Sequence, residues 1–172
     1  DIGVAMGQTG TEVSKEPAAM ILTDDNFATI VGAVAQGRVL YMNILKAIQF
    51  LLSSNLGEVL LIFVATVLNL GSPLLPIHIL WVNLITDSLP ALALGMEPAE
   101  PDVMDLPPRD PRSPIFTRPL LLRVIYQGLM IAGLSLAAYL TGARVSPETG
   151  HTMAFAVLAF SQLAHAFNVR SN

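Results

Sequence analysis

The sequence predicts a mainly α-helical protein that spans a membrane several times and carries a short α/β segment at its N-terminus. The 172-residue chain is 53% hydrophobic and only 13% charged. Its apolar residues gather in long stretches separated by short polar segments. Two short strand-like segments precede the first long stretch. This uneven, apolar composition is typical of a multi-span membrane protein rather than of a soluble domain.

The N-terminal segment, residues 1–30, is predicted to be the end of an α/β domain. The runs Asp1–Gly7 and Ala18–Thr23 read as short buried strands, and a small helix is expected at Glu12–Lys15 between them. The triplet Asp24–Asn26 then favours the cap of a helix that begins near Phe27. The nearby glycines lack the spacing of a phosphate-binding loop.

Four apolar stretches predict four membrane-spanning helices, since a span needs roughly 17 to 25 residues. The first stretch continues a preceding helical pattern without a strong breaker, so that stalk and span together cover 27–70. Such a helix of about 40 residues would be roughly 60 Å long, twice the hydrocarbon thickness. The other spans are predicted at 77–96, 120–141 and 152–168, and the last is the shortest.

The connecting segments predict the orientation. The turn at 71–76 is too short for anything but a tight connection between antiparallel neighbours. The loop at 97–119 is rich in proline and charge, which favours an extended surface that contacts a cytoplasmic domain. Basic residues fall almost entirely on one side of the spans, and Arg144 alone lies on the other. The residues on the basic side are Lys15, Arg38, Lys46, Arg109, Arg112, Arg118, Arg123 and Arg170. The positive-inside rule therefore predicts that both termini are cytoplasmic.

Composition also limits the chemistry. The chain contains no cysteine, which excludes disulfides and thiolate metal sites and leaves oxygen donors, which favour hard cations. Nothing in the sequence indicates nucleic-acid binding. The chain opens at Asp1 without an initiator methionine or a signal peptide, so we expect it to be a fragment of a longer protein.

Two carboxylates lie inside predicted spans, Glu58 in the first and Asp87 in the second. A charge near the bilayer centre costs roughly 2.5 to 3.5 kcal/mol on insertion scales, so such a residue usually binds an ion, carries a proton or lines a pathway. On helices, Asn55 shares a face with Glu58, while Asn83 and Thr86 share a face with Asp87. Alone, the two asparagines would more often hydrogen-bond neighbouring helices, but the carboxylates favour a cation site.

The oxygen donors of this set are two carboxylates, two amides and a hydroxyl, whereas Ca²⁺ typically takes six to eight oxygens. A third helix, backbone carbonyls or water must complete the shell. Pro90 removes a backbone hydrogen bond to residue 86, so the second span is expected to bend or unwind beside Asp87. Gly57 would let a neighbouring helix approach closely. Gln162 in the fourth span is left open between packing and ion coordination.

The two histidines of the spans are not expected to be metal ligands. His78 is predicted near the outer interface and His165 near the cytoplasmic one.

Several motifs resemble the C-terminal part of P-type cation ATPases of the calcium-pump type: Ile2–Gly7, Leu22–Phe27, Ser54–Glu58, Leu80–Asp87 and Met104–Arg109. The likeness is specific from residue 1 to about 119 and weaker beyond. By this resemblance, residues 1–30 end a phosphorylation domain and the spans are transmembrane helices five to eight. The ligands it implies for transported Ca²⁺ are Asn55, Glu58, Asn83, Thr86 and Asp87.

The resemblance implies a parent enzyme that hydrolyses ATP with Mg²⁺ and exports Ca²⁺, in which the stalk couples phosphorylation to the ion site. The phosphorylated aspartate and the nucleotide domain do not occur here, so the fragment alone is expected to be inactive. The pattern differs at Gln162, where the family's two-site pump carries Glu. The short loop at 142–151 resembles bacterial pumps, which implies a bacterial plasma membrane.

Other functions stay open at this point. Mn²⁺, Na⁺ or H⁺ pumping would use similar oxygen donors. A secondary transporter or channel subunit could relay protons through the buried acids without ATP, although it would leave the N-terminal strands unexplained. A truncated product that only assembles with other membrane helices is a third alternative.

Overall fold

The computed structural model describes residues 2–99, 103–105, 107–110 and 113–170. The chain divides into two compact units. The first comprises residues 1–41 and 99–107, and the second comprises residues 42–98 and 108–172.

The first unit contains a two-stranded parallel sheet. Strand β1, Val4–Met6, pairs with strand β2, Met20–Leu22, in the register Val4 to Met20. The short helix α1, Glu12–Lys15, lies between them in the chain. Parallel strands need a crossover connection, and this four-residue helix with its flanking turns provides it. The expected strand, helix and strand order is therefore confirmed.

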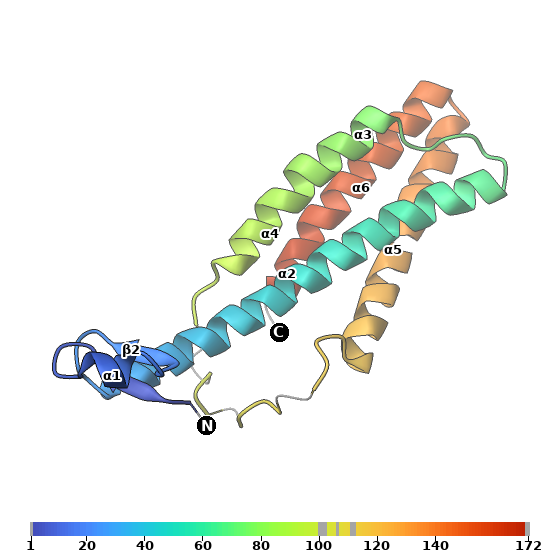
Figure 1. Cartoon of the computed structure of the whole chain (residues 1–172). Helices are drawn as coiled ribbons and strands as arrows, with labels where there is room; N and C mark the ends of the chain where they lie inside the picture. The colour runs from blue at the N-terminus through green and yellow to red at the C-terminus, as the bar shows by residue number, and fades with distance from the viewer. Residues whose placement is uncertain (1, 100–102, 106, 111–112, 171–172) are drawn as a thin grey trace. The chain divides into compact units, whose positions relative to one another are not determined.

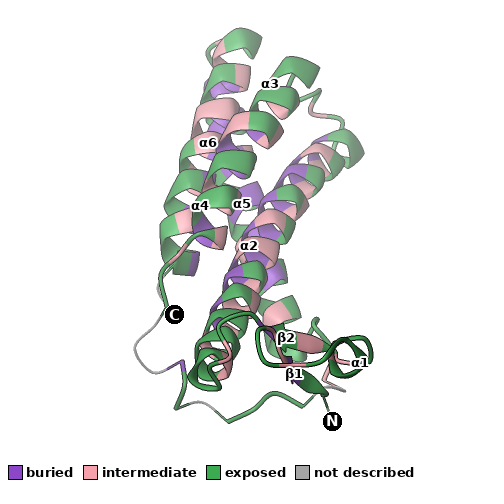
Figure 2. Ribbon diagram, turned by 60° about the vertical axis from the view of Figure 1, so that its left-hand side comes forward, coloured by how far each residue is buried: buried purple, intermediate pink, exposed green. Residues whose placement is uncertain are grey.

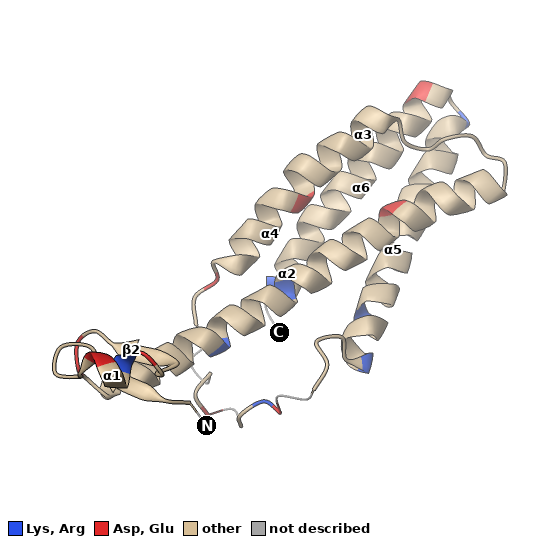
Figure 3. Ribbon diagram, in the orientation of Figure 1, with Lys and Arg blue, Asp and Glu red and all other residues tan. Residues whose placement is uncertain are grey.

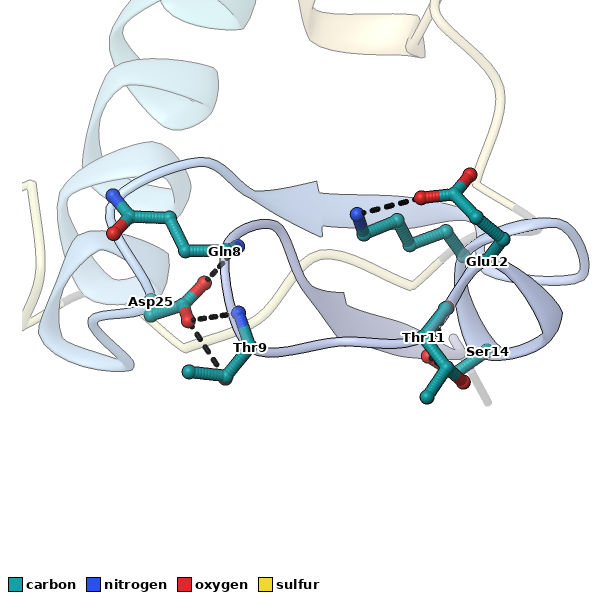
Figure 4. A network of polar contacts seen from close by, with 7 residues as sticks. Gln8, Thr9, Thr11, Glu12, Ser14 and Asp25 are labelled. Atoms are coloured by element: carbon teal, nitrogen blue, oxygen red, sulfur yellow. Dashed lines mark hydrogen bonds and ion pairs between the residues drawn. The ribbon is translucent and has the colours of Figure 1, made fainter.

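An acidic loop joins β2 to the following helix, and its two carboxylates act in different ways. Asp25 accepts hydrogen bonds from the backbone N–H groups of Gln8 and Thr9 at 2.8 and 2.7 Å, and from the Thr9 hydroxyl at 2.7 Å (Figure 4). These donors, the Gln8 N–H first among them, hold the pKa of Asp25 below its usual value. Asp25 thus binds the loop after β1, with its backbone at φ 50°.

The helix cap itself comes from the neighbours of Asp25. Asn26 Oδ1 accepts from the N–H of Ala28 at 3.0 Å, and Asp24 accepts from the N–H of Asn26 and from the hydroxyl of Thr29. The prediction that all three polar residues cap this helix is wrong for Asp25. Its carboxylate turns back to the loop of Gln8 because two backbone N–H groups converge there.

The second unit is helical (Figure 1). Helix α2 runs over Ala28–Val67 and supplies its residues from Met42 onward to this unit. Helix α3, Pro76–Trp81, continues into a π-helical segment η1, Val82–Asp87, and then into α4, Ser88–Gly95. Helices α5, Arg118–Ala143, and α6, Pro147–Arg170, complete it.

The helices of the described chain provide four candidate membrane spans by length and hydropathy, at Ala28–Val67, Pro76–Gly95, Arg118–Ala143 and Pro147–Arg170. Together with the small sheet, they confirm the predicted mainly α-helical, multi-span class. In α2 and the helices that follow it, basic positions lie in the N-terminal half of α2, in the first turns of α5 and at the end of α6, while acidic positions occur in the C-terminal half of α2, at the end of η1 and in the first turn of α6 (Figure 3). This distribution is typical of a protein that crosses a bilayer.

Burial in the helical unit is concentrated where the helices face one another (Figure 2). The main apolar cluster joins α2, η1, α5 and α6 through Leu61, Val82, Ile131 and Leu158, while Leu94 of α4 packs in a second, smaller cluster. Large apolar side chains on the outer faces, such as Phe63 on α2, stay exposed. In a soluble protein such surface would be costly, but in a bilayer it faces lipid tails.

Glycines let the helices approach closely. A Cβ atom at Gly57 of α2 would lie 2.9 Å from Ile131 Cγ2 of α5, and one at Gly128 of α5 would lie 2.9 Å from Leu56 side-chain atoms. The prediction that Gly57 permits close approach is confirmed, and α5 is the helix that approaches. Small residues at such crossings are the usual way to pack helices in membranes.

Candidate cation site

The first two polar side chains of the site come from α2. Asn55 and Glu58 are three residues apart on this helix, and therefore share a face. The Asn55 amide donates to the carbonyl of Leu51 at 2.8 Å, which fixes the side chain against its own helix. Glu58 is only 3% exposed. The site therefore starts from a buried carboxylate on the helix that packs against α5 at Gly57.

The other side of the site is the π-helical segment η1. In an α-helix the carbonyl of Thr86 would accept from the backbone N–H of residue 90, which Pro90 lacks. Single π-helical turns are frequent at functional sites. The span was predicted to bend or unwind beside Asp87, and the structure has an irregular π-helical segment there without unwound chain. It takes the form of a widened turn within a continuous span.

Side chains of η1 satisfy backbone carbonyls in and next to this widened turn. The Asn83 amide donates to Ile79 O at 2.9 Å, and the Thr86 hydroxyl lies 2.8 Å from Val82 O. The Ser88 hydroxyl donates to Asn83 O at 2.9 Å. These bonds hold the polar side chains of η1 in fixed directions.

Two amide–carboxylate pairs join α2 and η1 reciprocally. The Asn83 Nδ2 group donates to Glu58 Oε2 at 3.2 Å, and the Asn55 Nδ2 group approaches Asp87 Oδ2 at 3.4 Å. Each segment thus supplies one amide and one carboxylate to the other. The arrangement brings together four of the residues that the sequence nominated.

Gln162 of α6 completes the cluster. Its Nε2 group donates to Glu58 Oε1 at 2.8 Å, so that both oxygens of this carboxylate accept a hydrogen bond. Its Oε1 atom lies 3.0 Å from the Thr86 hydroxyl, which shares its single proton between Gln162 and Val82 O. Gln162 is fully buried. The residue that the sequence left open therefore contacts two of the nominated residues.

Asp87 is the less satisfied of the two acids. It is 1% exposed, and its Oδ1 atom has no hydrogen-bond partner in the described chain. A buried carboxylate oxygen without a partner is costly unless a proton, a water molecule or a cation meets it. The described residues contain no group of three or more His, Cys, Asp or Glu side chains that could hold a metal ion. A cation here would therefore depend on amide, hydroxyl and backbone oxygens beside the two carboxylates.

The amide side chains of the cluster can present either N–H groups or oxygen atoms. Asn55, Asn83 and Gln162 now present N–H groups to the carboxylates. Each amide also carries an oxygen on the same rotatable group, which could be turned toward a cation instead. The six nominated residues thus form two hydrogen-bonded groups, Asn55 with Asp87, and Glu58 with Asn83, Gln162 and Thr86. Their side chains suit either hydrogen bonding or the coordination of a hard cation.

The structure also contains polar residues near the site that sequence reasoning missed. Ser53 of α2 and His165 of α6 are buried and lie 2.7 Å apart, from Oγ to Nε2. His165 was expected near the cytoplasmic end of its span, and the structure shows that its side chain is held between α2 and α6. The hydroxyls of Ser54 and Ser135 are buried without a partner in the described chain. The sequence offered one signal for Ser53: it lies four residues after Gln49, so the two polar side chains share a face of the predicted helix.

Comparison with known proteins decides the family. The model of the family described as "Cation transporting ATPase, C-terminus" matches residues 71–172. The chain belongs to this family. The region includes η1 and α6, which carry Asn83, Thr86, Asp87 and Gln162.

Relatives of this cation-transporting ATPase chain extend over its whole length. It is 49% identical to calcium-transporting ATPase 1 of Bacillus cereus over 99% of the chain, and 48% identical to the calcium-transporting ATPase of Bacillus subtilis over 99% of the chain. Calcium-transporting ATPase type 2C member 2 of Rattus norvegicus is 42% identical, also over 99%. The chain covers 21%, 20% and 18% of these proteins, about a fifth of their length.

Proposed function

We propose that the chain is the ion-binding and coupling part of an ATP-driven pump that exports Ca²⁺ from the cytoplasm. The observation that carries this proposal is the pair of buried carboxylates, Glu58 and Asp87, each joined to the other's helix, by Asn83 and by Asn55 respectively. Two carboxylates and three amides inside membrane spans supply hard oxygen ligands. The names of the similar calcium-transporting ATPases support the choice of ion.

The assignment of the segments follows from this proposal. Residues 1–30 would end the phosphorylation domain, and 27–70 would form the stalk and the first ion-binding span. The spans at 77–96, 120–141 and 152–168 would follow, with 97–119 as a cytoplasmic loop between the first two. Mg²⁺ and ATP would bind to parts of the pump outside this chain. The partners would be the lipid bilayer and the pump's remaining domains and helices.

The proposed mechanism depends on relative movement of α2 and η1. In the ion-bound state Asn55, Glu58, Asn83, Thr86 and Asp87 would present oxygens to Ca²⁺, with Gln162 beside them. Movement of the stalk would then separate the two sets, lower the affinity and open the site to the other side. Buried carboxylates left without a cation are costly, so protons would replace the ion and be carried back. Both chain ends would be cytoplasmic, and the membrane would be a bacterial plasma membrane.

The test is ATP-dependent uptake of ⁴⁵Ca²⁺ by inside-out vesicles that contain the full-length protein. We expect uptake that requires ATP, together with a phosphoenzyme that forms only with Ca²⁺. Glu58→Gln should reduce both by about 100-fold at limiting Ca²⁺, whereas Glu148→Gln, at the exposed start of α6, should not. If Mn²⁺, Na⁺ or H⁺ activated phosphorylation and Ca²⁺ did not, the transported ion would be that cation and not Ca²⁺. Ion movement without ATP would contradict the pump altogether.

A further inference from the structure

His165 lies outside the proposed ligand set, yet it occupies the centre of the contact between α6 and α2. Its side chain is 2% exposed, and its Nε2 atom lies 2.7 Å from the Ser53 hydroxyl. Its ring stacks on Phe50 with a centroid separation of 5.9 Å and an interplanar angle of 28°. A buried, stacked and hydrogen-bonded histidine is held in one orientation.

The surrounding hydrogen-bond partners indicate where the Ser53 hydroxyl proton and the His165 ring proton lie. The Ser53 hydroxyl lies 2.7 Å from the carbonyl of Gln49, one turn earlier in α2, and can donate its single proton there. Ser53 Oγ then accepts from the Nε2–H of His165. The opposite arrangement would give Nδ1 the ring proton, and Nδ1 has no partner in the described chain. The first arrangement satisfies both protons and is favoured for that reason.

The pair belongs to a series of polar contacts between the antiparallel helices α2 and α6. The Lys46 ammonium donates to the carbonyl of Arg170 at 3.0 Å at one end. Ser53 and His165 meet next, and Gln162 then donates to Glu58 at 2.8 Å. His165 is three residues from Gln162, a rise of about 4.5 Å along α6, and the two side chains share a face.

We propose that His165 is a positioning residue for the ion site, which through Ser53 fixes the axial register of α6 on α2 and so holds Gln162 on Glu58. Apolar contacts between membrane helices are non-directional and tolerate sliding, whereas a buried hydrogen bond sets one register. Without it, the amide of Gln162 would lose its defined distance to Glu58. The activity assay of this inference rests on the proposed function, whereas the register of α6 on α2 can be tested without it.

Substitutions in the full-length pump separate this role from a merely structural one. The side-chain nitrogen of Gln can replace His Nε2, whereas that of Asn corresponds to Nδ1 and does not reach Ser53. We expect His165→Ala, His165→Asn and Ser53→Ala each to raise the Ca²⁺ concentration for half-maximal phosphoenzyme by 3- to 10-fold. The maximal phosphoenzyme level should be unchanged, and His165→Gln should restore the wild-type value.

Two controls sharpen the experiment. The double variant Ser53→Ala with His165→Ala should need no more Ca²⁺ for half-maximal phosphoenzyme than either single variant, since both substitutions remove the same contact. Ser161→Ala removes a hydroxyl whose one bond within the described residues goes to Leu158 O of its own helix, so it should leave the Ca²⁺ dependence unchanged. Equal behaviour of the Gln and Asn variants, or an additive double variant, would overturn the proposal. A changed pH dependence of Ca²⁺ activation in His165→Gln would also overturn it, in favour of a proton relay.

A distance measurement tests the register without reference to Ca²⁺. The chain has no cysteine of its own, so spin labels can be placed on cysteines introduced at Val59 of α2 and Phe160 of α6, both exposed. Any cysteines in the rest of the full-length protein are replaced by serine. We expect the distance distribution to shift or broaden in His165→Ala and to return in His165→Gln. An unchanged distribution in His165→Ala overturns the positioning role. Absence of any Ca²⁺-activated phosphoenzyme in the wild type, with the expected distances, would instead refute only the proposed function.

Discussion

Gln162 on α6 donates its Nε2–H to Oε1 of Glu58 on α2 at 2.8 Å, while the carbonyl oxygen of the same amide accepts from the Thr86 hydroxyl. One uncharged side chain thereby joins α6 to both α2 and η1. The amide stabilises the Glu58 carboxylate through a hydrogen bond without adding a charge of its own.

Removing this amide should weaken ion binding without abolishing it. Gln162→Ala leaves Glu58 Oε1 without its donor, and we expect the Ca²⁺ concentration for half-maximal activation to rise about 10-fold, the lower end of the usual effect of losing a supporting partner at a metal site. Ca²⁺-dependent phosphoenzyme formation measures it. Thr141→Val is the matched control, because the Thr141 hydroxyl bonds only within α5. An unchanged Ca²⁺ concentration for half-maximal activation in Gln162→Ala would show that the amide does not support Glu58.

The Thr86 hydroxyl offers a second, smaller test. Thr86→Val keeps the shape of the side chain but removes the oxygen that lies near Val82 O and Gln162 Oε1. We expect a several-fold loss of apparent Ca²⁺ affinity in Thr86→Val and close to wild-type affinity in Thr86→Ser, which retains the hydroxyl. The measurement is a Ca²⁺ titration of ATPase activity. Equal losses in both variants would mean that the methyl group, not the oxygen, matters.

Gly57 should be intolerant of a large side chain because α5 occupies the space beside it. A Cβ atom there already falls 2.9 Å from Ile131, so Gly57→Leu should destabilise the protein by about 1 to 3 kcal/mol through overpacking. A Cβ atom at Gly133 of α5 would have no atom within 4 Å, so Gly133→Leu serves as the control. Thermal inactivation in detergent compares the two. Equal stability would contradict the close approach of α2 and α5.

The Asp25 network predicts a pH dependence in the first unit. Because its donors depress the pKa of Asp25, the carboxylate stabilises the loop at every pH above the usual Asp value near 3.9. That stabilisation is lost as the pH falls through the depressed pKa. Asp25→Asn should therefore increase amide exchange at Gln8 and Thr9 at neutral pH, as measured by hydrogen–deuterium exchange. Glu12→Gln, a surface change in the same unit, should not alter exchange there.

Much of the fold follows from local patterns in the sequence. Hydropathy and length located the four membrane helices, and Pro90 pointed to the irregular turn beside Asp87. The spacing of Asn55 and Glu58 on one helix, and of Asn83 and Asp87 on the next, was enough to nominate the carboxylate network. These signals are local, because each depends on residues within a few turns of one another.

Contacts between distant segments were not predictable in the same way. Gln162 is 104 residues from Glu58, and His165 is 112 from Ser53. Nothing in the periodicity of α6 states which of its faces meets α2, so the contact of His165 with Ser53 could not be predicted. Asp25 was expected to cap a helix because the competing backbone donors, those of Gln8 and Thr9, lie 17 and 16 residues away.

The most direct test of the central claim is equilibrium binding of ⁴⁵Ca²⁺ to the full-length protein, with Asp87→Asn compared with wild type. Asp87 carries the buried Oδ1 atom without a partner in the described chain, so a bound cation should depend on it strongly. We expect saturable Ca²⁺ binding in wild type and in Glu148→Gln, and its loss in Asp87→Asn at the same Ca²⁺ concentration. Unchanged binding in Asp87→Asn would show that the cation does not bind at the Glu58 and Asp87 network.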